Sequence, residues 1–467
     1  MDAPRTLGGL RGAGYPDRTV KQELRANLIA RLRSGDPLLP DVVGFDATVV
    51  PDLERGILAG HDLILLGERG QAKSRIVRRL ADLLDETAPV AAGCEVNCHP
   101  YHPICARCRD LTAEHGDDLP VEWVARDRRF SEKLATPDTS VGDLIGDVDP
   151  IRVAEGRYLG DERTIHYGLL PRTNRGIFAL NELPDLPERI QVGLLNVLEE
   201  RDVQIRGYKI RLPLDVVLVA TANPDDYTNR GRIISPLKDR FGTQLRTHYP
   251  RTVDDEIAIA RQEAAPPPPG ADVRVPSFLE EVLAELTRQL RGSNQVNHRS
   301  GVSVRYTIGA RETLVAGAVR RALRTGEPQA VPRVVDLWPV VPAALGRIEF
   351  DTLEEGREEQ IVARLLRQAV LTVWRRYLGR HDLRPLLAHF DRGVSVETHD
   401  AMAGADLLGQ FGDEIPGLAR LMEELDVPAE SPAAAASVVE FALEGLHLSK
   451  RLNKDEAAPG VDRFRGV

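Results

Sequence analysis

The segment that most constrains the fold is an apolar run, HDLILL (61–66), that leads through the loop GERGQAKS (67–74) into a helical pattern, RIVRRLADLL (75–84). A buried strand that passes through a glycine turn into a helix is a building unit of parallel sheets. Two further apolar runs, at 176–180 and 216–221, are separated by another helical pattern. This alternation predicts an α/β fold with a parallel sheet and helices on both of its faces.

Length and composition narrow the classes of protein. The chain has 467 residues, which suggests two to four domains. Hydrophobic residues make up 42% and charged residues 28%, the balance of a globular protein in water. We find neither an apolar run of about 18 residues, as a membrane span needs, nor the apolar stretch of a signal peptide. We therefore expect a cytoplasmic protein, and the net charge of −10 argues against a nucleic-acid partner.

The loop nearly matches the phosphate-binding pattern G-x-x-x-x-G-K-[ST], in which backbone N–H groups hold phosphates at a helix N-terminus. Lys73 supplies the cation for the terminal phosphates, and Ser74 supplies a hydroxyl for magnesium. Ala72 stands where the pattern has its second glycine. An alanine costs little there as long as its φ stays negative, whereas a left-handed glycine could not be replaced so cheaply. We expect the phosphate cradle to survive the added methyl group.

Polar residues that suit nucleotide hydrolysis follow in a fixed order. The run at 176–180 ends in Asn181 and Glu182, where a Walker B motif has Asp-Glu. The glutamate would polarise the attacking water, while the neutral asparagine would hold magnesium less firmly. Asn223 ends the next apolar run and can hold that water or the γ-phosphate. Arg240 and Arg305 would each be an ordinary surface residue alone, but the order and spacing of the whole set indicate a nucleotide site.

These segments resemble AAA+ ATPases of the magnesium-chelatase ATPase-subunit and MoxR-like group. The matching stretches are VVG (42–44), GERGQAKS (67–74), PRTNRGIFALNEL (171–183), VATANP (219–224), LKDRFG (237–242) and SVR (303–305). The resemblance covers roughly residues 20–320, about two thirds of the chain by the usual size of domains. It implies ATP hydrolysis with ATP and Mg²⁺ as cofactors, a homo-oligomeric ring, expected as a hexamer, and a partner with a von Willebrand factor A domain.

The resemblance also implies roles for single residues. The catalytic set comprises Glu182, Asn223 as sensor 1, Arg240 as a finger that reaches a neighbouring subunit, and Arg305 as sensor 2. The nucleotide contacts comprise Val43 and Gly44 near the adenine, Asn181, and the loop residues Gly67, Glu68, Arg69, Gly70, Gln71, Ala72, Lys73, Ser74 and Arg75.

We expect four parts in the chain. They are an N-terminal helical segment at 1–40, a P-loop AAA+ nucleotide-binding core at 41–250, a helical lid with sensor 2 at 251–345, and a helical C-terminal extension at 346–467. Within the core, the segments 142–176 and 201–213 resemble the helix-2 insertion and the presensor hairpin of the family. In the extension, the alanine-rich stretch at 428–437 is expected as a break before the last helix.

All four cysteines lie within CEVNCHPYHPICARC (94–108), inside an insert at 91–110. The set Cys94, Cys98, Cys105 and Cys108 within 15 residues matches a tetrahedral structural zinc site. His99 and His102 are candidate substitutes if one cysteine does not bind. An iron–sulfur cluster also uses four cysteines, and the spacing does not exclude it. Reduced thiols without a metal are the remaining alternative.

Three functions fit this pattern. The first is an ATP-driven ring that remodels a partner protein or, more narrowly, drives metal insertion in a magnesium-chelatase-like complex. The second is a nucleotide-dependent regulator that hardly hydrolyses ATP, because Ala72 and Asn181 depart from the motifs. The third is a DNA-acting AAA+ protein with the cysteines as a zinc module. The acidic net charge opposes the third, and the sequence has neither the GAFTGA loop of sigma-54 activators nor a C-terminal helix-turn-helix signature.

Overall fold

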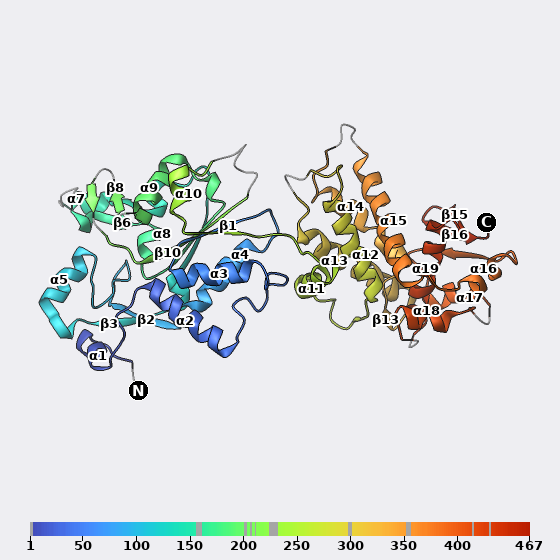
Figure 1. Ribbon diagram of the computed structural model, residues 1–467, viewed down its shortest axis with the longest axis horizontal. Helices are drawn as coiled ribbons and strands as arrows, with labels where there is room; N and C mark the ends of the chain where they lie inside the picture. The colour runs from blue at the N-terminus through green and yellow to red at the C-terminus, as the bar shows by residue number, and fades with distance from the viewer. Residues whose placement is uncertain are drawn as a thin grey trace. The chain divides into compact units, whose positions relative to one another are not determined.

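The computed structural model describes the chain in ten stretches: residues 3–155, 161–199, 203–205, 208–210, 212–223, 232–297, 301–351, 356–412, 415–428 and 431–467. The chain divides into two compact units, Met1–His248 and Tyr249–Val467 (Figure 1). The division into four parts expected from the sequence remains a prediction.

The first unit is built on a sheet of five parallel strands in the order β11-β1-β10-β7-β4. The strands are β1 (Leu63–Leu66), β4 (Phe130–Leu134), β7 (Gly176–Asn181), β10 (Val216–Ala222) and β11 (Thr243–Arg246). This confirms the predicted parallel sheet and its three central strands, which are apolar because both of their faces are buried. The edge strands β4 and β11 were not predicted, because FSEKL and TQLR contain no apolar run.

Helices cover both faces of this sheet, as predicted (Figure 1). Alternate strand residues face two separate cores: Ile177 and Val217 lie in one, and Phe178 and Leu218 lie in the other. The first core is completed by α2 (Val20–Ser34), α3 (Val49–Ala59) and α4 (Lys73–Arg79), and the second by α8 (Leu169–Arg172), α9 (Glu188–Glu199) and α10 (Ser235–Arg240). The period-2 alternation of side chains along a strand produces this separation.

Three antiparallel pairs project from the sheet unit. β2 (Thr87–Ala91) pairs with β3 (Val121–Ala125) around the cysteine segment. The expected hairpins at 142–176 and 201–213 contain the pairs β5 (Gly146–Val148) with β6 (Ile165–Tyr167), and β8 (Val203–Ile205) with β9 (Tyr208–Ile210). Residues 156–160, 201–202, 206–207 and 211 of these hairpins lie outside the described residues.

Short helices complete the first unit. They are α1 (Leu7–Gly12), η1 (Leu80–Leu83), α5 (Ala106–His115), η2 (Gly116–Asp118), η3 (Arg126–Arg129), α6 (Val141–Leu144), α7 (Pro150–Ala154), η4 (Glu162–Thr164) and η5 (Leu183–Asp185).

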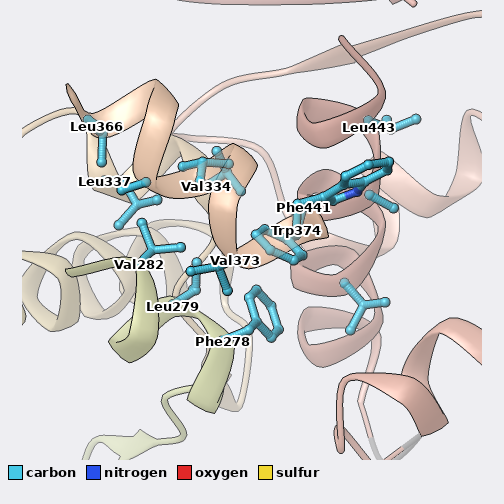
Figure 2. Packing of buried hydrophobic residues seen from close by; sticks show 14 of the residues in the cluster. Phe278, Leu279, Val282, Val334, Leu337, Leu366, Val373, Trp374, Phe441 and Leu443 are labelled. Atoms are coloured by element: carbon cyan, nitrogen blue, oxygen red, sulfur yellow. The ribbon is translucent and has the colours of Figure 1, made fainter. Parts of the chain in front are cut away.

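The second unit is largely helical, as predicted, and one apolar core runs from Phe278 to Phe464. Its helices are α11 (Val253–Glu263), α12 (Ser277–Arg291), α13 (Val304–Thr325), η7 (Val334–Leu337), α14 (Val340–Leu345), α15 (Glu358–Tyr377), α16 (Arg384–Phe390), α17 (Gly404–Gly409), α18 (Leu418–Glu424) and α19 (Pro432–Leu448). Figure 2 shows side chains from α12, α15 and α19 directed toward one another in this core. The rings of Phe278 and Phe441 lie 4.4 Å apart between centroids. At Gly445 an added Cβ would lie 2.0 Å from Trp374, so glycine permits the close packing of α19 on α15.

Three features of this unit differ from the expectation or go beyond it. The break expected at 428–437 is wrong from Pro432 onward, because α19 begins there. Ser431 caps the helix by accepting a hydrogen bond from the Ala434 N–H, and alanines favour the helix that follows. An antiparallel sheet of β14 (Ser395–Thr398), β16 (Val461–Arg465) and β15 (Asn453–Ala458) was not predicted. Its strands are short and rich in charged residues. A two-stranded parallel pair, β12 (Asp272–Val273) with β13 (Gln329–Ala330), is also present.

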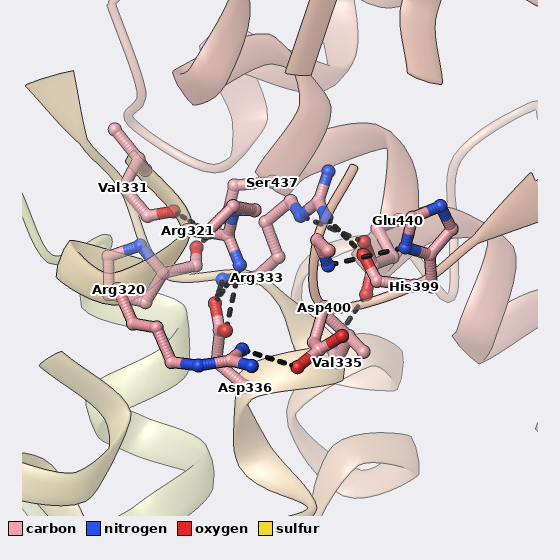
Figure 3. A network of polar contacts seen from close by, with 12 residues as sticks. Arg320, Arg321, Val331, Arg333, Val335, Asp336, His399, Asp400, Ser437 and Glu440 are labelled. Carbon is pink, nitrogen blue, oxygen red and sulfur yellow. Dashed lines mark hydrogen bonds and ion pairs between the residues drawn. The ribbon is translucent and has the colours of Figure 1, made fainter. Parts of the chain in front are cut away.

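A buried ionic network holds the C-terminal elements to the segment around η7 (Figure 3). Arg321 Nη1 donates to both carboxylate oxygens of Asp336 at 2.7 Å. Arg333 Nε lies 3.3 Å from Glu440 Oε2, and the Val335 N–H donates to Glu440 Oε1 at 2.6 Å. Buried charges persist only where they are paired and hydrogen-bonded. These contacts therefore fix α19 relative to η7 and have a structural role.

Candidate functional site

The loop at 67–74 lies at the carboxyl end of β1, between the ends of β10 and β11. The Gly67 N–H donates to Ala222 O at 3.1 Å, and the Thr247 N–H donates to Leu66 O at 2.9 Å. Gln71 Oε1 accepts from Thr247 Oγ1 at 2.9 Å and from a backbone N–H of the loop at 3.0 Å. A Cβ at Gly67 would lie 1.8 Å from Thr247 Oγ1. The first glycine of the loop is therefore required by the close approach of the next strand end.

Lys73 lies at the centre of the site and is 7% exposed. Its Nζ donates to the carbonyl oxygens of Gly67 and Glu68, the latter at 2.9 Å, and to Asn223 Oδ1 at 2.7 Å. Asn223 Nδ2 in turn donates to Glu182 Oε2 at 3.2 Å. The structure thus joins three of the predicted residues, Lys73, Asn223 and Glu182, into one hydrogen-bonded chain across three neighbouring strand ends. Ser74 follows Lys73 in the first turn of α4 and is exposed.

The methyl group of Ala72 was expected to cost little only if the φ of this residue were negative, and it is positive. Its φ is 55° and its ψ is 12°, which is the left-handed region. This conformation costs an L-residue about 1–2 kcal/mol relative to a right-handed helical one. The loop therefore keeps the backbone shape for which the pattern normally uses glycine, and it stores strain at Ala72.

Asn181 and Glu182 stand at the end of β7, where the backbone turns sharply. Glu182 has a φ of 54°, and its N–H donates to Thr221 Oγ1 at 3.1 Å. Thr221 Oγ1 donates to Asn181 Oδ1 at 3.3 Å, and Asn181 Nδ2 donates to Glu132 Oε1 at 2.5 Å. The sequence pattern did not predict Glu132 or Thr221 as site residues. Glu132 could have been found only by assigning FSEKL to the strand beside β7.

The predicted adenine-contacting residues lie in the segment before α3, and this segment is fastened to α4. Gly44 has a φ of 82°, a conformation that favours glycine. Arg75 Nη1 donates to Asp41 O at 3.1 Å, and Arg79 donates to both carboxylate oxygens of Asp41 at 2.8 and 2.7 Å. The hydrogen bonds from Arg79 hold the pKa of Asp41 below its ordinary value. Val43 is half-buried in the same segment.

The remaining predicted residues are placed apart from the hydrogen-bonded chain. In the loop itself, Arg69 is exposed, and Gly70 has a φ of 78°. Arg240 ends α10, and its Nη2 donates to Glu199 Oε1 of α9 at 2.6 Å; the two side chains are 44% and 41% exposed. Arg305 belongs to the second unit, near the start of α13, and is exposed.

The cysteine cluster lies between β2 and α5 and packs with one core of the sheet unit. The four sulfurs, all buried and without disulfides, lie within 4.8 Å of one another, and those of Cys94 and Cys105 are 3.9 Å apart. Backbone N–H groups of Cys98 and Cys108 donate at 3.4 Å to the sulfurs of Cys94 and Cys105. An ion with Zn–S bonds of about 2.3 Å holds tetrahedral sulfur ligands about 3.8 Å apart. The four thiols therefore fit a single tetrahedral ion.

The two candidate histidines lie outside the group of four sulfurs. His99 Nδ1 accepts from the Tyr101 N–H at 3.0 Å, and burial lowers the pKa of His99 to about 3. His102 Nε2 lies 2.7 Å from Asp17 Oδ2. Among the described residues, the group that can hold a metal consists of the four cysteines without either histidine.

The cysteine segment is tied to the chain that leads into β7. Asn97 Nδ2 donates to Arg172 O at 2.7 Å, and Asn174 Nδ2 donates to Val96 O at 3.0 Å. Asn174 Oδ1 accepts from the Asp215 N–H, just before β10, at 2.8 Å. The cysteine segment thus supports the start of β7 and β10, the two strands that lead to Glu182 and Asn223.

Comparisons with known proteins show which proteins this chain is similar to. The family model described as "Sigma-54 interaction domain" matches residues 152–238. The magnesium-chelatase 38 kDa subunit of Acidiphilium rubrum is 30% identical over 356 residues, which cover 70% of this chain and 93% of that protein. The magnesium-chelatase subunit ChlI of Anabaena variabilis is 29% identical over 234 residues, covering 48% and 62%. A chain in a solved complex between subunits BchI and BchD of magnesium chelatase is 22% identical, covers 71% of this chain and 93% of its own length, and has a TM-score of 0.34.

The chain belongs to the AAA+ ATPases related to the ATPase subunits of magnesium chelatase. The family resemblance predicted from the sequence is therefore confirmed. In the part of the chain that the structure describes, the helices are too short or too polar to cross a membrane.

The conformation of Ala72 leads to a test of stability. We expect Ala72→Gly to raise the free energy of unfolding by about 1 kcal/mol, because glycine adopts the left-handed conformation without strain. The greater conformational freedom of glycine in the unfolded chain offsets part of this gain. The matched control Ala81→Gly, in η1, should lower it by about 0.5–1 kcal/mol. Urea denaturation of the full chain measures both. If Ala72→Gly destabilises the protein as much as the control, Ala72 is not left-handed.

Proposed function

We propose that the protein hydrolyses ATP with Mg²⁺ and works as a ring-shaped motor that remodels a partner protein. The observation that carries the proposal is the hydrogen-bonded chain of Lys73, Asn223 and Glu182 at the carboxyl ends of three parallel strands. A cation for phosphate, an amide and a carboxylate meet there, as phosphoryl transfer to water requires. The family to which the chain belongs supports the same activity.

The residues of the loop fit a bound nucleotide. Backbone N–H groups of the loop and of the first turn of α4 would hold the phosphates. Lys73 Nζ, now in contact with loop carbonyls, would exchange them for phosphate oxygens. Ser74 and Asn181 would face the magnesium ion, which neutralises phosphate charge when it is bound. Val43 and Gly44 would lie near the adenine.

Asn223 joins the phosphate-binding side of the site to its hydrolytic side. Its Oδ1 accepts from Lys73, and its Nδ2 donates to Glu182. We assign Glu182 the task of orienting the attacking water and drawing off its proton, because its carboxylate accepts a hydrogen bond from this amide. Asn223 would then hold the carboxylate of Glu182 in position relative to the terminal phosphate.

Arg240 serves a neighbouring subunit in this proposal. Within its own chain it is paired with Glu199, and both side chains are substantially exposed. An exposed ion pair of this kind contributes little stability, so it can open at small cost. In a ring, Arg240 would leave Glu199 for the γ-phosphate of the next subunit. Arg305 would act as sensor 2.

Mixed rings test this arrangement. Arg240→Ala should bind ATP but fail to hydrolyse it, since such a finger contributes on the order of 10³–10⁵ in rate in other phosphoryl-transfer systems. Glu182→Gln should also be inactive. A mixture of the two should regain activity, because some interfaces then contain both intact residues. Steady-state phosphate release measures the rates, and Arg128→Ala, an exposed arginine of η3, is the matched control.

The concentration dependence completes this test. Turnover per chain should rise with protein concentration as rings form. Equal turnover in dilute and concentrated protein, or an inactive mixture of the two variants, would show that the ring mechanism is wrong.

A regulator with weak hydrolysis is the second candidate. The left-handed Ala72 and the neutral Asn181 favour it. Phosphate release that is the same in the unaltered protein and in Glu182→Gln would support this reading. The proposals of a hexamer, a partner with a von Willebrand factor A domain and a role in metal insertion rest on the family resemblance alone, and the proposal of a cytoplasmic location rests on the sequence analysis.

We further propose that Cys94, Cys98, Cys105 and Cys108 bind one Zn²⁺ ion. The sulfur separations support a single ion, because the thiolates of an iron–sulfur cluster bind different irons and lie farther apart. The ion would hold together a segment with few apolar residues of its own.

Elemental analysis tests the zinc proposal. We expect about one zinc per chain in protein purified without chelator. Cys108→Ser should lose it, and the matched control His102→Ala should retain it. Iron with visible absorption would identify a cluster instead, and protein without metal would leave free thiols.

A further inference from the structure

The neutral Asn181 has a carboxylate as its immediate neighbour. Glu132 lies on β4, the edge strand beside β7, in register with Ala179. Its side chain reaches along the sheet edge, so that Oε1 accepts a hydrogen bond from Asn181 Nδ2 at 2.5 Å. The charge that is missing from the end of β7 is therefore present on the next strand.

Asn181 and Glu132 form a matched pair. An aspartate at 181 would place a second carboxylate in hydrogen-bond contact with Glu132, and two carboxylates at that separation repel each other. The amide of Asn181 donates a hydrogen bond instead. The pair carries one negative charge, as a single aspartate would, but the charge resides on β4.

The amide can transmit this charge toward the nucleotide. A hydrogen bond to a carboxylate is charge-assisted, and it polarises the amide so that the oxygen becomes a better acceptor. Asn181 Oδ1 accepts from Thr221 Oγ1 at 3.3 Å, and Thr221 Oγ1 accepts from the N–H of Glu182 at 3.1 Å. Glu132 is thus linked through two side chains to the residue assigned to orient water.

We propose that Glu132 is a positioning residue for the magnesium ion of bound ATP, supplying through Asn181 the negative charge that an aspartate at 181 would supply. The inference rests on the proposed ATPase function. From the sequence alone, the neutral Asn181 was expected to hold magnesium weakly. In this inference the carboxylate of Glu132, on the neighbouring strand, compensates for the missing charge.

The ion pair with Arg78 offers a competing explanation for the role of Glu132. Arg78 Nε donates to Glu132 Oε2 at 2.7 Å and Nη2 donates to Oε1 at 3.2 Å, so Glu132 also connects β4 to α4. Arg78 is 66% exposed, whereas Glu132 is 20% exposed. If Glu132 serves only to hold Arg78, removing Arg78 should have the same effect as neutralising Glu132. If Glu132 serves magnesium, removing Arg78 leaves its charge free to act.

Manganese binding separates these explanations. Mn²⁺ replaces Mg²⁺ in such sites and is detected by electron paramagnetic resonance, here on the full chain with a non-hydrolysable ATP analogue. We expect Glu132→Gln to weaken Mn²⁺ binding about tenfold, the lower end of the range for residues that support metal ligands. The charge swap Glu132→Gln with Asn181→Asp should restore it to within about threefold. Arg78→Ala should not weaken it, and the exposed control Glu86→Gln should leave it unchanged.

The outcomes distinguish this inference from the proposed function. Unchanged Mn²⁺ affinity in Glu132→Gln, or an equal loss in Arg78→Ala, would overturn the role of Glu132 while leaving the ATPase proposal in place. Failure of the unaltered protein to bind the Mn²⁺–nucleotide complex would overturn both. If Glu132→Gln alone does not fold, Glu132→Asp supplies the test, because it keeps the carboxylate but withdraws it from Asn181 by one methylene: weaker Mn²⁺ binding would support the role of Glu132, and unchanged binding would overturn it.

Discussion

The contact between Lys73 Nζ and Asn223 Oδ1, at 2.7 Å, connects parts of the chain that are 150 residues apart. An ammonium group that is almost wholly buried must be surrounded by oxygen atoms, because an unpaired charge in such a place is costly. The loop carbonyls and the Asn223 amide provide these oxygens, and the amide continues to Glu182. The strand order β1-β10-β7 makes these neighbours possible, since parallel strands bring their carboxyl ends to one edge. The buried charge thus fixes three strand ends relative to one another.

The sequence predicted the elements whose burial is complete. The strands at 63–66, 176–181 and 216–222 are apolar because both faces are covered, and their polar terminal residues indicated the site. The edge strand β4 has polar side chains that meet solvent or neighbouring helices, so its pattern was not recognised and Glu132 was missed. The pairing of β4 with β7 brings Glu132 next to Asn181, although the two residues are far apart in the sequence.

Besides the strand β4, the backbone conformation of single residues could not be predicted from the sequence. The pattern of residues around Ala72 does not reveal the sign of its φ, which is positive at this residue directly before α4. The alanine-rich stretch before the last helix was misread for a related reason: alanine suits both a linker and a helix, and the cap at Ser431 decides between them. The cysteines were easier to predict, because four thiols in a short segment have few alternatives.

The central claim is that the loop at 67–74 binds a nucleotide through Lys73, and calorimetric titration of the full chain with ATP and Mg²⁺ tests it most directly. Loss of a charge-assisted contact costs roughly 1.5–3 kcal/mol, so Lys73→Ala should weaken ATP binding by at least about tenfold or abolish it. Circular dichroism of the variant checks that the fold is retained. Saturable binding by the unaltered protein together with its loss in the variant is the predicted result; equal affinity in the two proteins would contradict the account.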